Sequence, residues 1–419
     1  MFVKYVKNEN RVPIKIWLPS IEYVEESCLE QANNLSNLPF VFKHVALMPD
    51  THSGYGMPIG GVLATKDVII PNAVGVDIGC GVCYVQTNIP STLLREAKTP
   101  EGSLLETVIK TILQNIPTGF AHHSKKQSCY TLEKAKQRLN DDIDYFKLMI
   151  KAAQAFDEIE AGFYQVGTLG GGNHFIELQE DENGMVAIMI HSGSRNFGYK
   201  ICNRFNLMAK KLNEMWFSQV SSEWQLSFLP LYSDVGMAYK AWMDLALDFA
   251  KENRNKIMTK VKEIFFNLIK KHTGFTDIEI SMEINAHHNY AAIENHFGEN
   301  VVVHRKGAIR VREGELGIIP GAMGSYSYIV EGLGNPESFF SCSHGAGRLM
   351  SRAAAIEKFT PNEVIEELNS DGVILGKTDI KDIAEEYKGA YKDIDFVISQ
   401  ELDLVKPIKK LKTIGVVKG

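Results

Sequence analysis

The sequence is poor in cysteine and has no long apolar run. Its 419 residues include six cysteines, spread from position 28 to position 342, which is too sparse for a disulfide framework. No stretch approaches the roughly 18 uninterrupted apolar residues of a membrane-spanning helix, and the opening residues MFVKYVKNENRVPIKIW contain no apolar run of signal-peptide length. We therefore expect a cytoplasmic protein with no membrane segment, whose thiols are available as metal ligands or nucleophiles.

The commonest nucleotide-binding signatures are absent too. No G-x-x-x-x-G-K-[ST] segment occurs, and no G-x-G-x-x-G opens a strand-helix-strand unit, so neither a P-loop nor a dinucleotide fold is predicted. Internal repeats, low-complexity tracts and Pro/Ser-rich linkers are also missing. The formal charge of −6 argues against bulk non-specific binding to nucleic acid, although it leaves room for a local basic groove.

Two kinds of segment alternate along the chain. Long amphipathic stretches at 131–160 and 236–272 carry apolar residues at helical spacing, and Gly274 after the second is a typical helix stop. Short β-type runs such as VFKHVALM, MVAIMI, EISMEI and NVVVHR end in polar or glycine-rich segments. The pattern predicts one α+β domain over residues 1–419, with a β-sheet core and helical insertions at about 92–165 and 199–275.

Histidines gather at the ends of those β-type runs, with glycines beside most of them. One such histidine alone is typical of a hydrogen-bonded loop side chain, but several in glycine-rich loops indicate a ligand site, because glycine lets the backbone approach a metal or an anion closely. The segments are MPDTHSGYG with Asp50 and His52, GGGNH with His174, HSGSR with His191, NAHHNY with His287 and His288, and SCSHGAGR with His344.

The segment NAVGVDIGCGVC at 72–83 adds a carboxylate, Asp77, and a thiol, Cys80. Together with imidazoles these ligands suit Mn, Zn, Fe or Co better than Mg or Ca, and a thiolate can bridge two ions. Cys80 and Cys83 also spell C-x-x-C. A structural zinc site needs a second close pair, which is missing, and a redox dithiol needs a following helix, whereas GVCYVQTNI is strand-like. We interpret Cys83 as a small buried hydrophobe.

His344 has a different setting, because it precedes GAGR and the helical run LMSRAAAIEKF. We expect it near a helix N-terminus, where an anion is favoured, with Arg348 and Arg352 on one helical face. The three side chains predict a phosphate site with an imidazole nucleophile at its mouth. The segments GGGNH and IIPGAMGSYSYIV are weaker indications of a nucleotide.

A set of motifs running through nearly the whole chain resembles the RtcB family of RNA ligases. They are FKHVALMPDTHSGYGMPIGG, NAVGVDIGCG, LGGGNHFIE, HSGSR, HHNY, RKGA, GIIPGAMGS, SCSHGAGR, AYKDID and the terminal VKG, in this order. The resemblance implies an enzyme that joins RNA ends bearing a 2′,3′-cyclic phosphate or 3′-phosphate to 5′-hydroxyl ends. It also implies GTP and two Mn²⁺ ions as cofactors, with a guanylylated histidine as the intermediate.

The resemblance also implies roles for individual residues. His344 corresponds to the histidine that becomes His–GMP, and further active-site positions are Asp50, for general acid/base assistance, and Lys306, for phosphate contact. One manganese is implied at Cys80, His191 and His288 and the other at Asp77, Cys80 and His174, with Cys80 bridging. The implied GMP contacts are Asn173, Glu177, Ser327, Tyr391 and Lys418, and the implied RNA or triphosphate contacts are Arg195, Arg348 and Arg352.

The sequence departs from the family pattern at Ala322, where a serine is common, so one hydrogen bond to GMP is absent. The loop TGFAHHSKKQSC at 118–129 is unusual; we interpret it as a solvated charged loop, with RNA contact as the alternative. Two rival functions stay open: a metal-dependent RNA cyclic phosphodiesterase or phosphatase that needs no GTP, and a non-catalytic metal sensor or nucleotide-binding module. The family implies RNA as partner, from tRNA splicing or RNA repair, and an archease-type activator is a further expectation. We expect a monomer.

Overall fold

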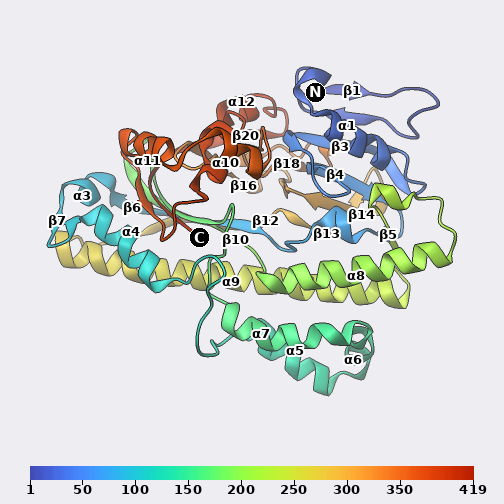
Figure 1. Cartoon of the computed structure of the whole chain (residues 1–419), viewed down its shortest axis with the longest axis horizontal. Coiled ribbons are helices and arrows are strands. Elements are labelled where there is room, and N and C mark those ends of the chain that lie inside the picture. Colours follow the sequence, from blue (N-terminus) through green and yellow to red (C-terminus); the bar gives the residue numbers. More distant parts are fainter.

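Two β-sheets form the centre of the structure, a computed structural model that describes residues 1–419 (Figure 1). The larger sheet contains, in spatial order, β12 (Ile280–His287), β6 (Gly81–Pro90), β10 (Met185–Ser192), β9 (Phe175–Asp181), β20 (Val405–Lys418), β17 (Tyr326–Gly332) and β16 (Leu316–Ile319), with β19 (Ile374–Gly376) paired to β20. The smaller sheet contains β1 (Phe2–Lys4), β2 (Ile14–Ile16), β3 (Val41–His52), β4 (Ile59–Thr65), β14 (Glu299–Lys306) and β13 (Asn289–His296).

Three two-stranded ribbons complete the strands, and the helices cover the sheets. The ribbons are β5 (Val68–Ile69) with β11 (Leu229–Pro230), β7 (Lys98–Thr99) with β8 (Gly102–Ser103), and β15 (Ala308–Arg310) with β18 (Ser341–Ser343). The helices are α1 (Glu26–Ser36), α2 (Pro71–Val74), α3 (Ser91–Glu96), α4 (Leu104–Asn115), α5 (Tyr130–Asp141), α6 (Ile143–Met149), α7 (Phe156–Gln165), α8 (Asn196–Met215), α9 (Asp234–Thr273), α10 (Arg352–Lys358), α11 (Pro361–Ser370) and α12 (Ile394–Ser399).

The alternation of side chains along β10 explains why the large sheet is covered on both faces. Ile188 and Ile190 pack into a core with residues of α4 and α9, whereas Ala187 and Met189 pack into another core with residues of α11. Successive side chains of a strand point to opposite faces, so the apolar run MVAIMI needs cover on each side. This rigid central strand carries His191 at its end.

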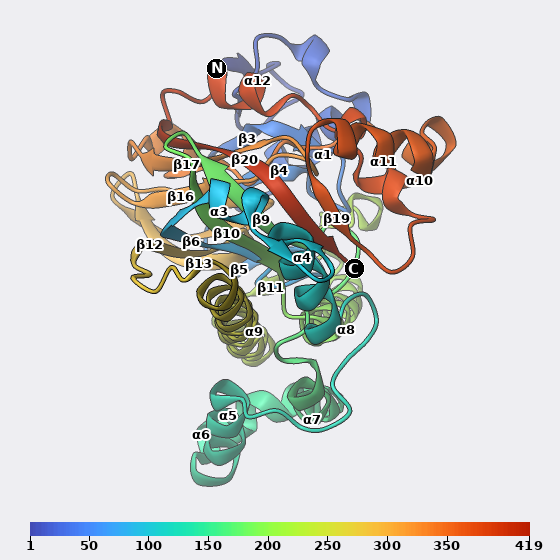
Figure 2. The ribbon, with the colours of Figure 1, turned by 90° about the vertical axis from the view of Figure 1, so that its left-hand side faces the viewer.

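The long helix α9 confirms the prediction for 236–272. The Ser233 hydroxyl caps its first turn by accepting a hydrogen bond from the Gly236 N–H, and Gly274 ends it with a φ of +72°. Helix α8 runs beside α9, and α5 to α7 lie beyond them, on the side away from the sheets (Figures 1 and 2). No helix, α9 included, combines the length and the apolar character needed to cross a membrane.

The stretch 131–160 is helical but not continuous. Its first helix, α5, ends at Asp141, and the carboxylate of Asp142 then caps α6 by accepting hydrogen bonds from the N–H groups of Asp144 and Tyr145. A 3₁₀ segment with a non-helical Ala152 separates α6 from α7. The Asp142 cap therefore separates two helices in a stretch whose apolar periodicity is continuous. The α+β fold class and the strand assignments for MVAIMI, EISMEI and NVVVHR are confirmed.

Candidate active site

The cysteine and histidine segments meet at one edge of the large sheet. Cys80 immediately precedes β6, and His191 at the end of β10 pairs with Val82 near the start of β6. His174 immediately precedes β9, while His288 follows β12, and its N–H donates to the Cys80 carbonyl oxygen at 2.9 Å. Because β12, β6, β10 and β9 are successive neighbours, strand order brings these four side chains together.

Cys80, His174 and His191 form a buried cluster whose ligand atoms all lie within 4.8 Å of one another. The Cys80 Sγ is 3.4 Å from His174 Nε2 and 3.2 Å from His191 Nε2. Each ring is held through its other nitrogen, His174 Nδ1 by the Leu169 carbonyl oxygen at 3.0 Å and His191 Nδ1 by the Asn173 carbonyl oxygen at 3.1 Å. Backbone acceptors that bind Nδ1–H leave both Nε2 lone pairs directed at the thiol, as metal ligation requires.

Asp77 and His288 extend this cluster. One Asp77 oxygen, Oδ2, lies 3.2 Å from His174 Nε2, and the other, Oδ1, is buried without a hydrogen-bond partner, as is His288 Nδ1. A Cβ at position 193 would collide with the Asp77 carboxylate, so this close approach requires Gly193. Unpartnered buried polar atoms are costly, and their position beside a Cys/His cluster fits a site for metal ions.

Burial shifts the pKa values of histidine and cysteine side chains in this cluster. Burial holds the pKa values of His191 and His288 well below the ordinary histidine value, which keeps the imidazoles neutral and able to coordinate. Burial and the Asp77 carboxylate raise the pKa of Cys80 well above its ordinary value. A bound divalent cation reverses this, because it lowers the pKa of a coordinating thiol.

His344 lies next to this cluster and is held by Asp50. The His344 ring centroid is 4.8 Å from that of His288. The Asp50 Oδ2 atom lies 2.7 Å from His344 Nδ1 and accepts the backbone N–H of the same residue at 3.0 Å. Asp50 is fully buried in β3. With the proton on Nδ1, donated to the carboxylate, His344 keeps the Nε2 lone pair free for nucleophilic attack.

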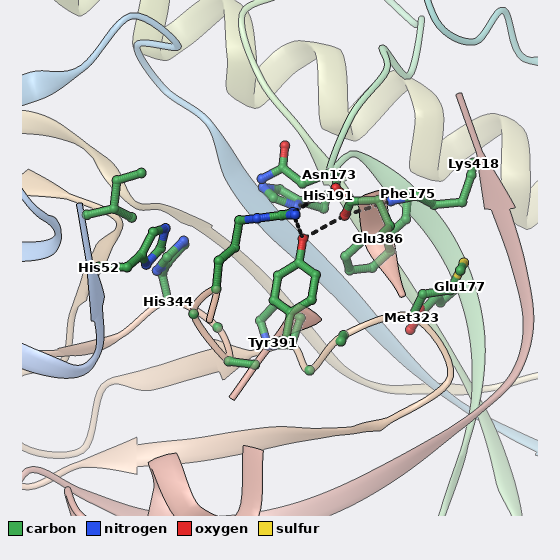
Figure 3. A pocket seen from close by; sticks show the side chains of 18 of the residues that line it. His52, Asn173, Phe175, Glu177, His191, Met323, His344, Glu386, Tyr391 and Lys418 are labelled. Atoms are coloured by element: carbon green, nitrogen blue, oxygen red, sulfur yellow. Dashed lines mark hydrogen bonds and ion pairs between the residues drawn. The ribbon is translucent and has the colours of Figure 1, made fainter. Parts of the chain in front are cut away.

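A pocket opens beside His344 (Figure 3). On its wall, Tyr391 donates its hydroxyl hydrogen to Glu386 at 2.9 Å and accepts a hydrogen bond from Arg348 Nη1 at 2.8 Å, while Lys418 Nζ donates to Glu386 at 3.3 Å. Burial acts to raise the pKa of Glu386, but the charge of Lys418, and after it that of Arg352, keeps this pKa below the ordinary value. Glu386 therefore contacts Arg348, Tyr391 and Lys418.

A second buried carboxylate on the pocket lining is that of Glu177. Its Oε2 accepts hydrogen bonds from Gln179 Nε2 at 2.7 Å and from the Thr413 hydroxyl at 3.0 Å. Gln179 also donates to the Ser327 hydroxyl oxygen at 3.0 Å, which connects Ser327 to the same network. Burial raises the pKa of Glu177 to about 7.

Comparison with known proteins decides the family. Residues 31–419 match the family model described as "tRNA-splicing ligase RtcB". The chain belongs to the RtcB family. It is 37% identical over 425 residues to the RNA-splicing ligase RtcB of Escherichia coli K12, covering 97% of each chain. It is 30% identical over 468 residues to the tRNA-splicing ligase RtcB of Thermococcus kodakarensis, covering 98% of this chain and 95% of that one.

Most side chains that the RtcB resemblance singled out lie in or beside this one pocket. Cys80, His174 and His191 form the metal-type cluster, with Asp77 beside His174 and the His288 ring beside His191. Asp50 is hydrogen-bonded to His344, and Ser327 is connected to Glu177 through Gln179. The lining includes Asn173, Glu177, His191, His344, Arg348, Arg352, Tyr391 and Lys418. Cys83 is buried in the core packed by α4 and α9, as predicted for a small hydrophobe.

Two residues of the RtcB pattern occupy other positions. Arg195 lines a neighbouring hollow, where its Nη2 donates to the Gly119 carbonyl oxygen at 2.8 Å. Lys306 is buried, and its Nζ donates to the carbonyl oxygens of Tyr55 at 2.7 Å and Asn72 at 3.2 Å. Burial lowers the pKa of Lys306 to about 8. Its ammonium group thus ties two backbone segments together and is not part of the pocket wall.

The prediction that Arg348 and Arg352 share one helical face is wrong. Helix α10 begins only at Arg352, because the Ser351 hydroxyl caps it by accepting the Ala354 N–H. Gly347 has a φ of +76°, and Arg348 forms an isolated β-bridge with Tyr391. His344 therefore does not lie at a helix N-terminus, and the positive charge on the pocket lining comes from arginine and lysine side chains rather than from a helix end.

Two pocket residues were assigned no role from the sequence. His52 lies on the lining, with Nδ1 3.0 Å from the Asp50 carbonyl oxygen, and burial lowers its pKa to about 4. It belongs to MPDTHSGYG, so its segment was recognised but its role was not. Glu386 could not be recognised as a site residue from the sequence, because nothing in EEYKGAY distinguishes it from its neighbour Glu385.

Proposed function

We propose that this chain is an RNA ligase that joins 3′-phosphate or 2′,3′-cyclic phosphate ends to 5′-hydroxyl ends, in tRNA splicing or RNA repair, with GTP and Mn²⁺ as cofactors. The observation that carries the proposal is the pairing of His344 with Asp50 at the mouth of a pocket beside the Cys80 cluster. This imidazole presents Nε2 as a nucleophile, which a metal sensor or a simple nucleotide-binding module does not need.

In the first step His344 Nε2 attacks the α-phosphorus of GTP. A bond from nitrogen to phosphorus forms, the bond to the β-phosphate oxygen breaks, and pyrophosphate leaves. The Asp50 carboxylate keeps the proton on Nδ1 and stabilises the positive charge that develops on the ring, which gives Asp50 an orienting and electrostatic role. Arg348 and Lys418 on the pocket wall are placed to neutralise phosphate oxygens.

We assign Cys80, His191 and His288 as the residues that would hold one manganese ion, and Asp77, Cys80 and His174 as those that would hold the other, with Cys80 common to both sets. A thiolate, imidazoles and a single carboxylate fit a transition metal better than Mg²⁺ or Ca²⁺, and the unpartnered Asp77 oxygen supports a metal site here. The choice of Mn²⁺ among transition metals rests on the family. Bound manganese supplies positive charge to phosphate oxygens as a Lewis acid.

For the nucleotide, we assign Glu177 as the acceptor for guanine N–H groups, with Asn173, Ser327, Tyr391 and Lys418 as further contacts. Glu177 lies on the lining, and its carboxylate is held by neutral donors, Gln179 and Thr413. Ala322 also lies on the lining, and it offers no hydroxyl. A lost hydrogen bond there weakens GMP binding by about 0.5–1.5 kcal/mol without abolishing it.

The remaining steps transfer GMP to RNA. Water opens a cyclic phosphate to the 3′-phosphate, an oxygen of that phosphate displaces His344 from GMP, and the 5′-hydroxyl then attacks the activated phosphorus and releases GMP. GMP makes a good leaving group, whereas a phosphate monoester oxygen does not. Arg195, Arg348 and Arg352 are the proposed RNA phosphate contacts, and Lys306 supports the site through the Tyr55 and Asn72 segments.

Labelling with GTP tests the proposal. Protein is incubated with α-³²P-labelled GTP and MnCl₂ and separated on a denaturing gel, with His344→Ala as the test variant and His272→Ala, at the end of α9, as the matched control. We expect an acid-labile, alkali-stable label on the wild type and the control but not on His344→Ala. A label that persists in His344→Ala contradicts the assigned nucleophile. No label on manganese-loaded wild type favours the GTP-independent phosphodiesterase.

We further propose that residues 1–419 act as one catalytic domain, as a monomer in the cytoplasm. Repeated turnover by the purified chain, measured as ligated RNA per enzyme, tests whether it needs an archease-type activator. Ligation that stops after one turnover and resumes on addition of such a protein supports the need for it.

A further inference from the structure

Phe120 is fully exposed on the loop that follows α4, although the loop around it is held in place. The Gly119 N–H donates to the Gly170 carbonyl oxygen at 2.8 Å, and the Gly119 carbonyl oxygen accepts a hydrogen bond from Arg195 Nη2 at 2.8 Å. On the other side, the His123 N–H donates to the Tyr164 carbonyl oxygen at 2.9 Å. The loop therefore presents an aromatic ring to solvent from a fixed backbone.

The ring borders a hollow of ≈ 840 Å³, which we call the Phe120 hollow. This volume lies within the roughly 300–1,000 Å³ of small-ligand sites. The hollow shares Arg352 and Lys418 with the catalytic pocket, so the two are adjacent. Only two of its nineteen lining residues are hydrophobic, a composition unsuited to an apolar peptide segment.

The end of the chain joins the Phe120 loop to the catalytic pocket. Gly419 packs so closely on Gly170 and Gly119 that a Cβ there would collide with the Gly170 carbonyl oxygen, and Lys377 Nζ binds the Gly419 carbonyl oxygen. Figure 1 shows this end beside the loop after α4. Phe120 thus directly follows Gly119, which contacts Gly419, and Gly419 directly follows the pocket residue Lys418.

The charged side chains of the hollow suit a phosphate backbone. Arg352 is half exposed and faces Glu385 at 3.6 Å, and the exposed Lys381 faces Asp379 at 3.9 Å. Such loose, solvated pairs contribute little, so the cations can exchange their partners for phosphate groups. An aromatic face beside basic side chains is the combination that binds single-stranded nucleic acid, because every base can stack on it.

We propose that the Phe120 hollow binds the RNA strand that ends in the 3′-phosphate, with one base of that strand stacked on Phe120. The inference rests on the proposed function and adds a binding site outside the catalytic pocket. The 3′-phosphate strand is favoured because the hollow leads towards the metal-type cluster, where the proposed reaction takes place on the 3′-phosphate. Gly171 and Gly172 line the hollow, and two residues after them His174 belongs to that cluster. The proposal thus takes up RNA contact by the 118–129 loop, the alternative to the solvated-loop interpretation.

The test is a binding titration with a fluorescein-labelled single-stranded oligoribonucleotide that ends in a 3′-phosphate. Its fluorescence polarisation is measured with the full chain, Phe120→Ala and Phe120→Trp. Loss of one stacked base weakens binding about 5- to 150-fold, so we expect that change in Phe120→Ala and near wild-type affinity in Phe120→Trp. Phe217→Ala is the matched control, because Phe217 is equally exposed but lies outside both the pocket and the hollow.

A series of probes with one abasic position each identifies the stacked base. One position should weaken binding to the wild type and not to Phe120→Ala. Equal affinities of wild type and Phe120→Ala, an equal loss in Phe217→Ala, or no RNA binding by the wild type would each overturn the proposal. GTP labelling of the same samples separates the two hypotheses: it should be unchanged in Phe120→Ala, and its absence in the wild type contradicts the ligase function but not the stacking result.

Discussion

His344 and Asp50 are joined by two hydrogen bonds to one oxygen atom, across 294 residues of sequence. The Asp50 Oδ2 binds both the backbone N–H and the Nδ1 of His344, so the carboxylate fixes the position of the residue as well as the orientation of its ring. The imidazole ring therefore has little rotational freedom. Its Nε2 is held toward the pocket, which is the arrangement an intermediate on this nitrogen requires.

Asp50→Asn should slow the labelling of His344 by GTP. If the amide NH₂ faces the ring, the imidazole must carry its proton on Nε2, and this tautomer is not nucleophilic. A hydrogen bond to a charged group is worth about 1.5–3 kcal/mol, so we expect a rate about 10- to 100-fold lower at unchanged manganese content. The check is the time course of radiolabel incorporation. An unaltered rate would show that ring orientation by Asp50 does not limit the step.

Cys80→Ala should remove most of the bound manganese, because the thiolate is proposed to bridge both ions. Cys83→Ala is the matched control: it also deletes a buried thiol three residues away, but that thiol lies in the hydrophobic core. Metal per chain is measured by elemental analysis after dialysis against MnCl₂. We expect two ions in Cys83→Ala and fewer than one in Cys80→Ala. Two ions retained in Cys80→Ala would disprove the bridged site.

Glu386→Gln should weaken GTP binding by about tenfold or more. The carboxylate compensates the charges of Lys418 and Arg348 in a buried setting, and breaking a buried pair costs about 3–5 kcal/mol, which is shared between stability and binding. Glu385→Gln provides the comparison, since Glu385 meets the half-exposed Arg352 at 3.6 Å and such pairs contribute about 0–1 kcal/mol. The measurement is the KM for GTP in the labelling reaction, and equal values for both variants would exclude this role of Glu386.

Glu401 should make a contribution to the free energy of unfolding that falls between pH 5 and pH 8. It is fully buried, accepts the Ser343 N–H at 2.9 Å, and burial raises its pKa to about 8 from an ordinary 4.5. Between these values the unfolded chain has lost the proton that the folded chain still holds, so this contribution falls as pH rises, by at most about 1.4 kcal/mol per pH unit.

Glu401→Gln keeps the acceptor and removes the titration. In urea unfolding at pH 5, 6, 7 and 8, the free energy of unfolding of the wild type minus that of the variant should therefore fall as pH rises, because the buried histidines contribute equally to both proteins. Parallel pH profiles of the two proteins would mean that Glu401 is ionised at the same pH in the folded and the unfolded chain.

The apolar run MVAIMI and the helical spacing of apolar residues in α9 were readable from the sequence because they are local properties. Strand β10 buries both faces, and α9 begins at a serine cap and ends at a glycine with positive φ. The break between α5 and α7 was not readable from periodicity, because the capping contacts of Asp142 outweigh it. The same holds for the start of α10, where the Ser351 cap leaves Arg348 outside the helix.

By itself the sequence determined which residue types are available for chemistry: thiol, carboxylate and imidazoles between glycines, and the RtcB family that their order indicates. The tertiary structure alone decided their partners. It paired Asp50 with His344, made Glu386 the link between Arg348, Tyr391 and Lys418, and turned the Lys306 ammonium toward two backbone carbonyl oxygens. The reason is physical: propensity and periodicity act over a few residues, whereas the partner of a buried charge depends on which distant strands and loops become neighbours.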